Sequence, residues 1–351
     1  MFSSNSHIYN HSVYKMMPLI IAGLGISALM ALSMGANDLA NSIAPIVGSK
    51  VLNFQHTLIL FFTSSFVGAV LQGFMVIKTL GKGIVSDVEL LGSISASLAA
   101  FIWIMLASIK GIPISTTHSI TGSVIGIGMA YTFLEGRAVS INLDIVSKIV
   151  LSWITSPLSA MAIAIPLYFL TEKMLGRYNN KHITPLALAM AILAAYSFGT
   201  NDVGNAIGVY VSITSKTLSI PDSTTMRLLA IYSTIFIGLG GALLGRRVVE
   251  TMAYRITRLD ITTSVAANAD AIAVLLYTTI PYILFGYGMP VSTTYAAAGA
   301  IIGAGIAKYR SLKALNLKLI LFIMFAWVIT LPVTSSLAIA IYSLLKHLLL
   351  G

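Results

Sequence analysis

The chain has 351 residues, of which 57% are hydrophobic and 9% charged, whereas a soluble domain usually has about 25% charged residues. This composition excludes a water-soluble globular protein and indicates several helices within a lipid bilayer. The net charge of +10 does not indicate a nucleic-acid partner, because the cations lie in short segments between apolar runs, where Lys and Arg set membrane topology. The absence of cysteine excludes disulfides and thiolate-bound metals.

The chain opens with a polar segment, residues 1–17, which we predict to be an N-terminal tail. We do not expect the apolar run that follows, Pro18 to Met34, to be a removable signal peptide, because little positive charge precedes it and it leads directly into an unusual motif. Further runs are long enough to span the roughly 30 Å hydrocarbon core: Leu58 to Ile77, Ile94 to Ile109, Ile149 to Leu170 and Leu319 to Leu345. We predict an all-α polytopic membrane protein in the cell membrane.

Comparing the chain with itself reveals a repeat. The string GANDLAN at residues 35–41 is matched by GTNDVGN at 199–205, and GIPISTTH at 111–118 is matched by GMPVSTTY at 288–295. Weaker matches keep the same order: Gly68, Gly73 and Thr79 with Gly240, Gly245 and Thr251, and Trp153 and Pro157 with Trp327 and Pro332. We predict two transmembrane repeats, residues 18–172 and 183–346, joined by a loop at 173–182. Such halves are typical of secondary transporters, whose site lies between them near the bilayer midplane.

The charges of equivalent loops indicate how the repeats are oriented. Lys78 and Lys82 correspond to a richer set in the second repeat, Arg246, Arg247, Arg255 and Arg258. Likewise, Arg137 and Lys148 correspond to Lys308, Arg310, Lys313 and Lys318. Cytoplasmic loops carry an excess of Lys and Arg, so we predict that equivalent loops lie on opposite faces and that the repeats have inverted topology.

Asp38 and Asp202 stand out because each lies inside an apolar segment at the same place in the repeat. An ionisable group at membrane depth is costly and persists mainly where it faces a cavity or pathway and has a partner. Asparagines accompany each aspartate, and helical spacing gathers them on one face: Asn37 and Asn41 in the first copy, Asn201 and Asn205 in the second. Such a face offers oxygens to a hard cation and amide N–H groups to an anion. We predict a coupling-cation site, with sodium favoured over a proton, at Asn37, Asp38, Asn201 and Asp202.

Glycines flank the same motif, and two interpretations of them stay open. They either belong to the site or let helices approach closely. The positions concerned are Gly35, Gly199, Gly204 and Gly208.

The Pro-x-Ser-Thr-Thr motif predicts a broken helix whose second part starts with a capping hydroxyl. A helix N-terminus binds anions through its free N–H groups and the positive end of its dipole. The apolar runs around both copies are short and interrupted, and paired interrupted segments mark the binding sites of transporters. The candidate anion ligands are Ser115, Thr116, Thr117, Ser292, Thr293 and Thr294. The next residue differs between the copies, being His118 in one and Tyr295 in the other, which argues against a required histidine pair. His118 is either a proton switch, a hydrogen-bonding group or a structural histidine.

The four motif copies, in this order, resemble the inorganic phosphate transporter (PiT) family over both halves of the chain. The resemblance implies an inverted-repeat fold with paired re-entrant or broken helices that meet across the substrate. It implies symport of inorganic phosphate with sodium ions or protons, or of sulfate as in some bacterial relatives. By this likeness Asp38, Asn41, Asp202 and Asn205 map onto the cation and phosphate site, and the two Ser-Thr-Thr runs onto the phosphate cradle. Tyr295 departs from the usual histidine, Pro45 and Gly204 are also unusual, and a homodimer is possible.

Two other functions can be weighed against transport. Paired intramembrane aspartates also occur in aspartyl proteases, where two carboxylates share a proton and activate water. That chemistry needs neither the asparagines nor the repeated Ser-Thr-Thr, so we predict a transporter without a cofactor rather than an enzyme. A phosphate sensor of the same fold that does not transport remains an alternative, because its binding residues would look alike.

Overall fold

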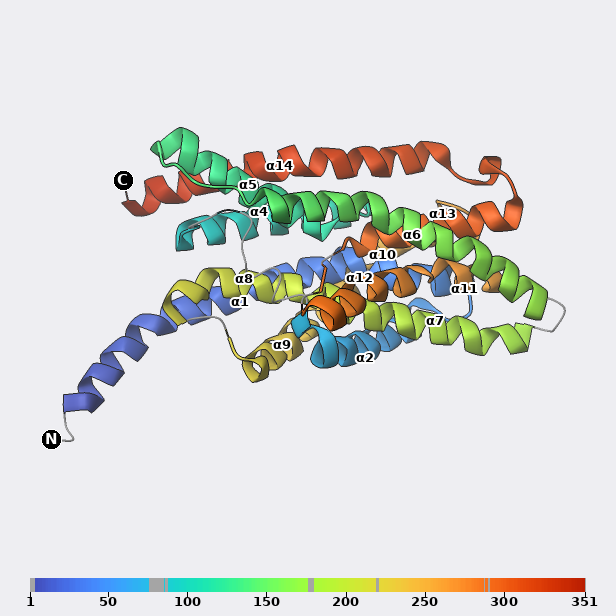
Figure 1. Ribbon diagram of the computed structural model, residues 1–351, viewed down its shortest axis with the longest axis horizontal. Helices are drawn as coiled ribbons and strands as arrows, with labels where there is room; N and C mark the ends of the chain where they lie inside the picture. The colour runs from blue at the N-terminus through green and yellow to red at the C-terminus, as the bar shows by residue number, and fades with distance from the viewer. Residues whose placement is uncertain are drawn as a thin grey trace.

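The computed structural model describes residues 4–75, 85, 88–175, 180–218, 221–286, 288–289 and 291–350. Lys78, Thr79, Lys82 and Pro290, and part of the predicted loop at 173–182, lie outside these residues. Within them the chain is helical apart from turns, short links and one isolated β-bridge between Val85 and Ile141 (Figure 1). The elements are α1 (Ser4–Gly48), α2 (Phe54–Gln72), α4 (Leu90–Ile109), α5 (Thr116–Glu135), α6 (Leu143–Leu175), α7 (Asn180–Asn201), α8 (Val203–Leu218), α9 (Ser223–Leu244), α10 (Arg246–Tyr254), α11 (Ile261–Ala267), α12 (Asp270–Phe285), α13 (Thr293–Tyr309), the 3₁₀ turn η1 (Leu312–Ala314) and α14 (Leu317–Leu350).

The described residues include eight helical segments long and apolar enough to cross a membrane. They comprise residues 17–48, 54–72, 90–109, 146–174, 181–214, 223–244, 261–285 and 317–349. The prediction of an all-α polytopic membrane protein is therefore confirmed. α1 begins at Ser4, so most of the polar segment before Pro18 forms the first turns of this helix. These turns project from the bundle (Figure 1).

Each repeat contains a helix pair that is broken just before its Ser-Thr-Thr run. In the first repeat α4 ends at Ile109 and α5 starts at Thr116, and in the second α12 ends at Phe285 and α13 starts at Thr293. Each break has a glycine in the left-handed region at or near its start, Gly111 at φ 69° and Gly286 at φ 77°, a conformation that costs glycine little. The predicted paired broken helices are thus present in both repeats.

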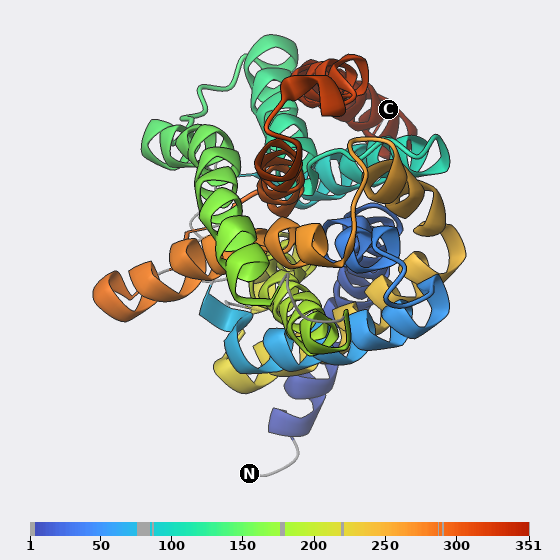
Figure 2. The same cartoon turned by 90° about the vertical axis from the view of Figure 1, so that its right-hand side faces the viewer.

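The repeats interlock instead of packing as separate bodies. α5 of the first repeat lies along α14 of the second, and α13 of the second lies along α6 of the first (Figures 1 and 2). In the same way α1 packs on α9, and α7 packs on α2. Helices of both halves therefore pack against the segments that carry the motifs.

Glycines make these crossings possible. A Cβ atom on Gly35 of α1 would lie 1.8 Å from the Ile237 oxygen, and one on Gly199 of α7 would lie 2.1 Å from the Ser65 oxygen. The opposite helices approach as closely: a Cβ on Gly240 would lie 1.9 Å from the Leu32 oxygen, and one on Gly68 2.1 Å from the Tyr196 oxygen. Gly35 and Gly199 are thus packing residues, like the small residues that let membrane helices meet.

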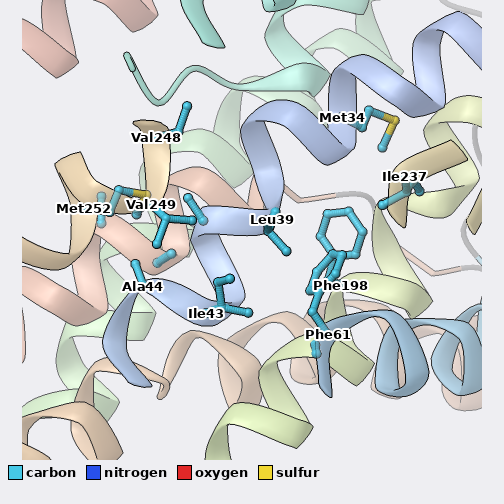
Figure 3. Packing of buried hydrophobic residues seen from close by; sticks show 14 of the residues in the cluster. Met34, Leu39, Ile43, Ala44, Phe61, Phe198, Ile237, Val248, Val249 and Met252 are labelled. Carbon is cyan, nitrogen blue, oxygen red and sulfur yellow. The ribbon is translucent and has the colours of Figure 1, made fainter. Parts of the chain in front are cut away.

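A cluster of buried hydrophobic side chains packs around the segment of α1 that carries the first motif. Leu39 and Ile43 are fully buried in the same cluster as Phe61 of α2 and Phe198 of α7 (Figure 3). The two phenylalanine rings are tilted by 53° with centroids 5.0 Å apart, a favourable aromatic geometry. This packing holds the polar side chains of the intervening positions in place.

Candidate functional site

The two aspartates are both buried, but their helices differ. Asp38 is 1% exposed and lies within the continuous α1, whereas Asp202 is 2% exposed and interrupts the helix between α7 and α8. The helical segment that carries the second motif is therefore interrupted at Asp202, whereas the segment that carries the first motif is not. Gly204 stands where α1 has Ala40, and glycine weakens a helix interior by roughly 0.5–1 kcal/mol relative to alanine. This glycine weakens the start of α8, two residues beyond the break.

The first asparagine of each motif clamps the backbone just ahead of a Ser-Thr-Thr run. Asn37 donates to the Ile112 oxygen and accepts from the Ile114 N–H, both at 3.0 Å. Asn201 brackets Val291 in the same way, donating to its oxygen at 2.8 Å and accepting from its N–H at 3.1 Å. Both side chains thereby fix the start of the following helix. The amide oxygen of each asparagine keeps a second lone pair that can bind a further group. Their predicted role as sodium ligands stays a prediction.

The N-termini of α5 and α13 meet. Ser115 caps α5 by accepting from the His118 N–H at 3.3 Å, and Ser292 caps α13 by accepting from the Tyr295 N–H at 3.4 Å. The Ser292 hydroxyl donates to the Ser115 hydroxyl at 2.9 Å. The N–H groups of the first helical residues have no partner within their own helix, so the two positive helix ends converge at one buried place.

The threonines that follow connect this place to the aspartates. Thr116 donates to one Asp38 oxygen, and Thr294 of the other repeat donates to the second at 3.3 Å. Thr293 donates to Asp202 at 3.2 Å. Hydroxyl groups therefore join Asp38 to both helix ends, and so to both repeats, and join Asp202 to the end of α13.

Asn41 adds the remaining cross-link. Its amide group donates to the hydroxyls of Thr293 and Thr294 at 3.2 and 3.1 Å, while its oxygen is buried without a partner. Asn205 and Thr117 are also buried, but their side chains make no hydrogen bond to another described residue. Hydrogen bonds thus connect most of the predicted residues to the two helix ends, but not Asn205 or Thr117, and the Asn41 oxygen is an available ligand atom.

A stack of aromatic rings packs beside the two Ser-Thr-Thr runs, and little in the sequence indicated it. Trp153 stacks on His118 with centroids 3.3 Å apart, and Trp327 stacks on Tyr295 at 3.7 Å. The Tyr295 hydroxyl and His118 Nε2 are 2.8 Å apart, and the Trp327 indole donates to the Pro113 oxygen at 3.1 Å. The repeated tryptophans were the signal. His118 and Tyr295 occupy equivalent positions in the two repeats and hydrogen-bond to each other. The two different side chains therefore act as partners.

The charge balance of the site limits what it can bind. Among the described residues no Lys or Arg is buried, whereas Asp38 and Asp202 are. Within the described part of the chain, the positive charge beside them is that of two helix N-termini, worth about half an elementary charge each. An anion can donate hydrogen bonds to the carboxylates and accept them from the helix ends, and a bound cation would offset the negative charge. Carboxylate, amide and hydroxyl oxygens are the donor atoms that such a hard cation takes.

Comparison with known proteins gives a consistent result. A family model described as "Phosphate transporter family" matches residues 34–189 and again residues 176–338. A protein of Bacillus subtilis named "Probable low-affinity inorganic phosphate transporter" is 30% identical over 322 residues, covering 89% of this chain and 92% of the relative. A solved structure titled "The sodium-dependent phosphate transporter" superposes with a TM-score of 0.80 at 26% identity, covering 95% of this chain and 100% of the other. The two family matches agree with the two repeats.

Proposed function

The chain belongs to the phosphate transporter family and is a multi-pass membrane protein, and from this we propose that it carries inorganic phosphate together with sodium across the cell membrane. The observation that carries the proposal is the meeting of two helix N-termini, one from each repeat, with Asp38 and Asp202 beside them. Alternating exposure of such a central site by inverted repeats moves the substrate from one side to the other.

Phosphate is bound, in this proposal, between the ends of α5 and α13. Free backbone N–H groups and the hydroxyls of both Ser-Thr-Thr runs donate to its oxygens. Asn205 and the amide group of Asn41 add donors from α8 and α1. The carboxylates of Asp38 and Asp202 accept from the hydroxyls of protonated phosphate, which bare sulfate lacks. A site built around such a bond discriminates strongly against the analogue without it.

Sodium is the proposed coupling ion. Two carboxylates next to an anion, with no Lys or Arg among the buried described residues, repel the anion unless a cation joins them. Asp38 and Asp202 are the charged ligands, Asn37 and Asn201 contribute second lone pairs, and the partnerless Asn41 oxygen is a further donor atom. The sodium-dependent neighbour supports sodium over the proton. The family likeness also implies a homodimer, and measuring the mass of the purified protein in detergent tests this.

Binding measurements on the purified protein test this coupling. Labelled phosphate should bind more tightly in sodium than in potassium at fixed pH, and phosphate should raise sodium affinity by the same factor, as linkage requires. Asp38→Asn and Asp202→Asn should reduce that factor, because each removes a charge from the cation site. If phosphate affinity is equal in the two salts but changes with pH, the coupling ion is the proton and not sodium.

A further inference from the structure

The helices that carry the two Ser-Thr-Thr runs meet along a helical turn, not only at their capping serines. His118 follows Ser115 by three residues in α5, and Tyr295 follows Ser292 by three residues in α13, so each ring lies on the same side of its helix as the serine. The Tyr295 hydroxyl and His118 Nε2 are 2.8 Å apart, and the two serine hydroxyls are 2.9 Å apart. Two hydrogen bonds, one turn apart, therefore join the repeats beside the cradle.

The hydrogen bond between His118 and Tyr295 is buried, and its two atoms have no alternative. His118 is 3% exposed and Tyr295 is 7% exposed. Among the described residues the Tyr295 hydroxyl makes no other hydrogen bond, and Nδ1 of His118 has no partner either. A buried polar group that loses its partner bears the full cost of its desolvation. Each of the two side chains therefore depends on the other for its hydrogen bond.

Two tryptophans pack against this pair, one on each side. Trp153 of α6 stacks on His118 with the ring planes tilted by 27°, and Trp327 of α14 stacks on Tyr295 with a tilt of 23°. The His118 and Tyr295 ring centroids are 4.7 Å apart. Trp327 also donates to the Pro113 oxygen of the first repeat at 3.1 Å. The four rings thus form one row across the boundary between the repeats, and their packing restricts the central pair to this arrangement.

Phosphate binding affects the two hydrogen bonds between the repeats differently. In the proposed function the hydroxyls of Ser115 and Ser292 donate to phosphate, and each hydroxyl has a single proton to donate. Ser292 then no longer donates to Ser115. The bond between His118 and Tyr295 lies one turn further along the helices and uses no group that the anion needs. It is therefore the bond that can hold the two helix ends together while phosphate is bound.

We propose that His118 and Tyr295 set the distance between the N-termini of α5 and α13 and so match the cradle to the size of phosphate. They are positioning residues, because they act through the two helix ends and not through contact with the anion. This inference rests on the proposed function. Arsenate has the same shape and protonation as phosphate but longer bonds to its oxygens. A cradle held at a fixed width therefore favours phosphate over arsenate, and a cradle without this bond favours it less.

Binding of phosphate and of arsenate to the purified protein in detergent, at fixed sodium and pH, tests the pair. Tyr295→Phe removes the hydroxyl and keeps the ring that stacks on Trp327. It should weaken phosphate binding by roughly 2- to 12-fold, as expected for the net contribution of one hydrogen bond, and should weaken arsenate binding less. The ratio of the two dissociation constants decides, because a variant that is only destabilised loses affinity for both anions by the same factor.

The matched control is Tyr232→Phe. The Tyr232 hydroxyl also joins the two repeats, since it donates from α9 to the Leu24 oxygen of α1 at 3.1 Å, but it is not part of the cradle. This variant should bind phosphate and arsenate with the affinities of the wild type.

A second variant shows whether the two side chains act together. His118→Phe breaks the same bond, so combining it with Tyr295→Phe should weaken phosphate binding no further than the more severe single change does. Additive losses, or an unchanged ratio of the two dissociation constants in Tyr295→Phe, would overturn the proposal. If His118→Phe does not fold, the ratio measured for Tyr295→Phe decides alone. If the wild type binds neither anion, the proposed function fails and the positioning role fails with it, whereas normal wild-type binding with an unchanged ratio refutes only the positioning role.

Discussion

Replacing Thr293 by valine tests the cradle with little change of shape. The Thr293 hydroxyl donates to Asp202 at 3.2 Å and accepts from Asn41 at 3.2 Å. Valine has nearly the same volume and leaves no cavity, so the expected loss is that of the one hydrogen bond that the hydroxyl donates to the phosphate anion under the proposed function, about 1.5–3 kcal/mol. This corresponds to roughly a 10- to 150-fold loss of phosphate affinity. Thr116→Val should behave alike, because Thr116 donates to Asp38 at the matching position.

Binding of labelled phosphate to purified protein at fixed sodium and pH measures both variants. The matched control is Thr234→Val, since Thr234 is equally buried but bonds only to the Ala230 oxygen of its own helix at 2.7 Å. The control should bind phosphate as the wild type does. Unchanged affinity in both Thr116→Val and Thr293→Val would reduce these threonines to helix caps and refute the cradle.

Three further predictions concern packing, substrate and pH. Gly199→Ala should lower the thermal midpoint, because its Cβ would lie 2.1 Å from the Ser65 oxygen and overpacking costs about 1–3 kcal/mol, whereas Gly25→Ala, with nothing within 4 Å, should not. Arsenate should compete with labelled phosphate uptake and sulfate should not, because only arsenate keeps a proton to donate to Asp38 or Asp202; equal competition would favour a sulfate carrier. Hydrogen bonds from Lys346 and Tyr342 lower the pKa of Glu135 from its usual 4.5, so its stabilising contribution is present above that pH and lost as pH falls through the lowered pKa. Glu135→Gln should weaken the acid dependence of the thermal midpoint, and an identical pH profile would contradict this.

The repeated motifs made much of the site predictable. Asp38, Asp202 and both Ser-Thr-Thr runs stand out because polar groups in apolar segments are costly and these occur twice. Asp270 also lies in an apolar segment, but it has no counterpart in the first repeat, so self-comparison gives no sign of it. Comparing the two repeats therefore identified the aspartates and the two Ser-Thr-Thr runs, but not Asp270.

The pairing of helices was not predictable from the sequence pattern. Apart from the face that carries Asn37, Asp38 and Asn41, the part of α1 after Pro18 is apolar, and nothing in that pattern indicates that α1 packs on α9 of the other repeat. The clamp that Asn37 makes on Ile112 and Ile114 depends on this long-range geometry. Gly35 and Gly199 show the same limit, because the carbonyl that each one contacts belongs to a distant segment.

Phosphate uptake into proteoliposomes with an imposed sodium gradient tests the central claim most directly. With proton gradient and membrane potential collapsed, inward sodium should drive labelled phosphate to a higher concentration inside than outside, and Asp38→Asn and Asp202→Asn should abolish this accumulation. Phosphate that only equilibrates, at the same rate with and without the sodium gradient, would contradict sodium-coupled transport.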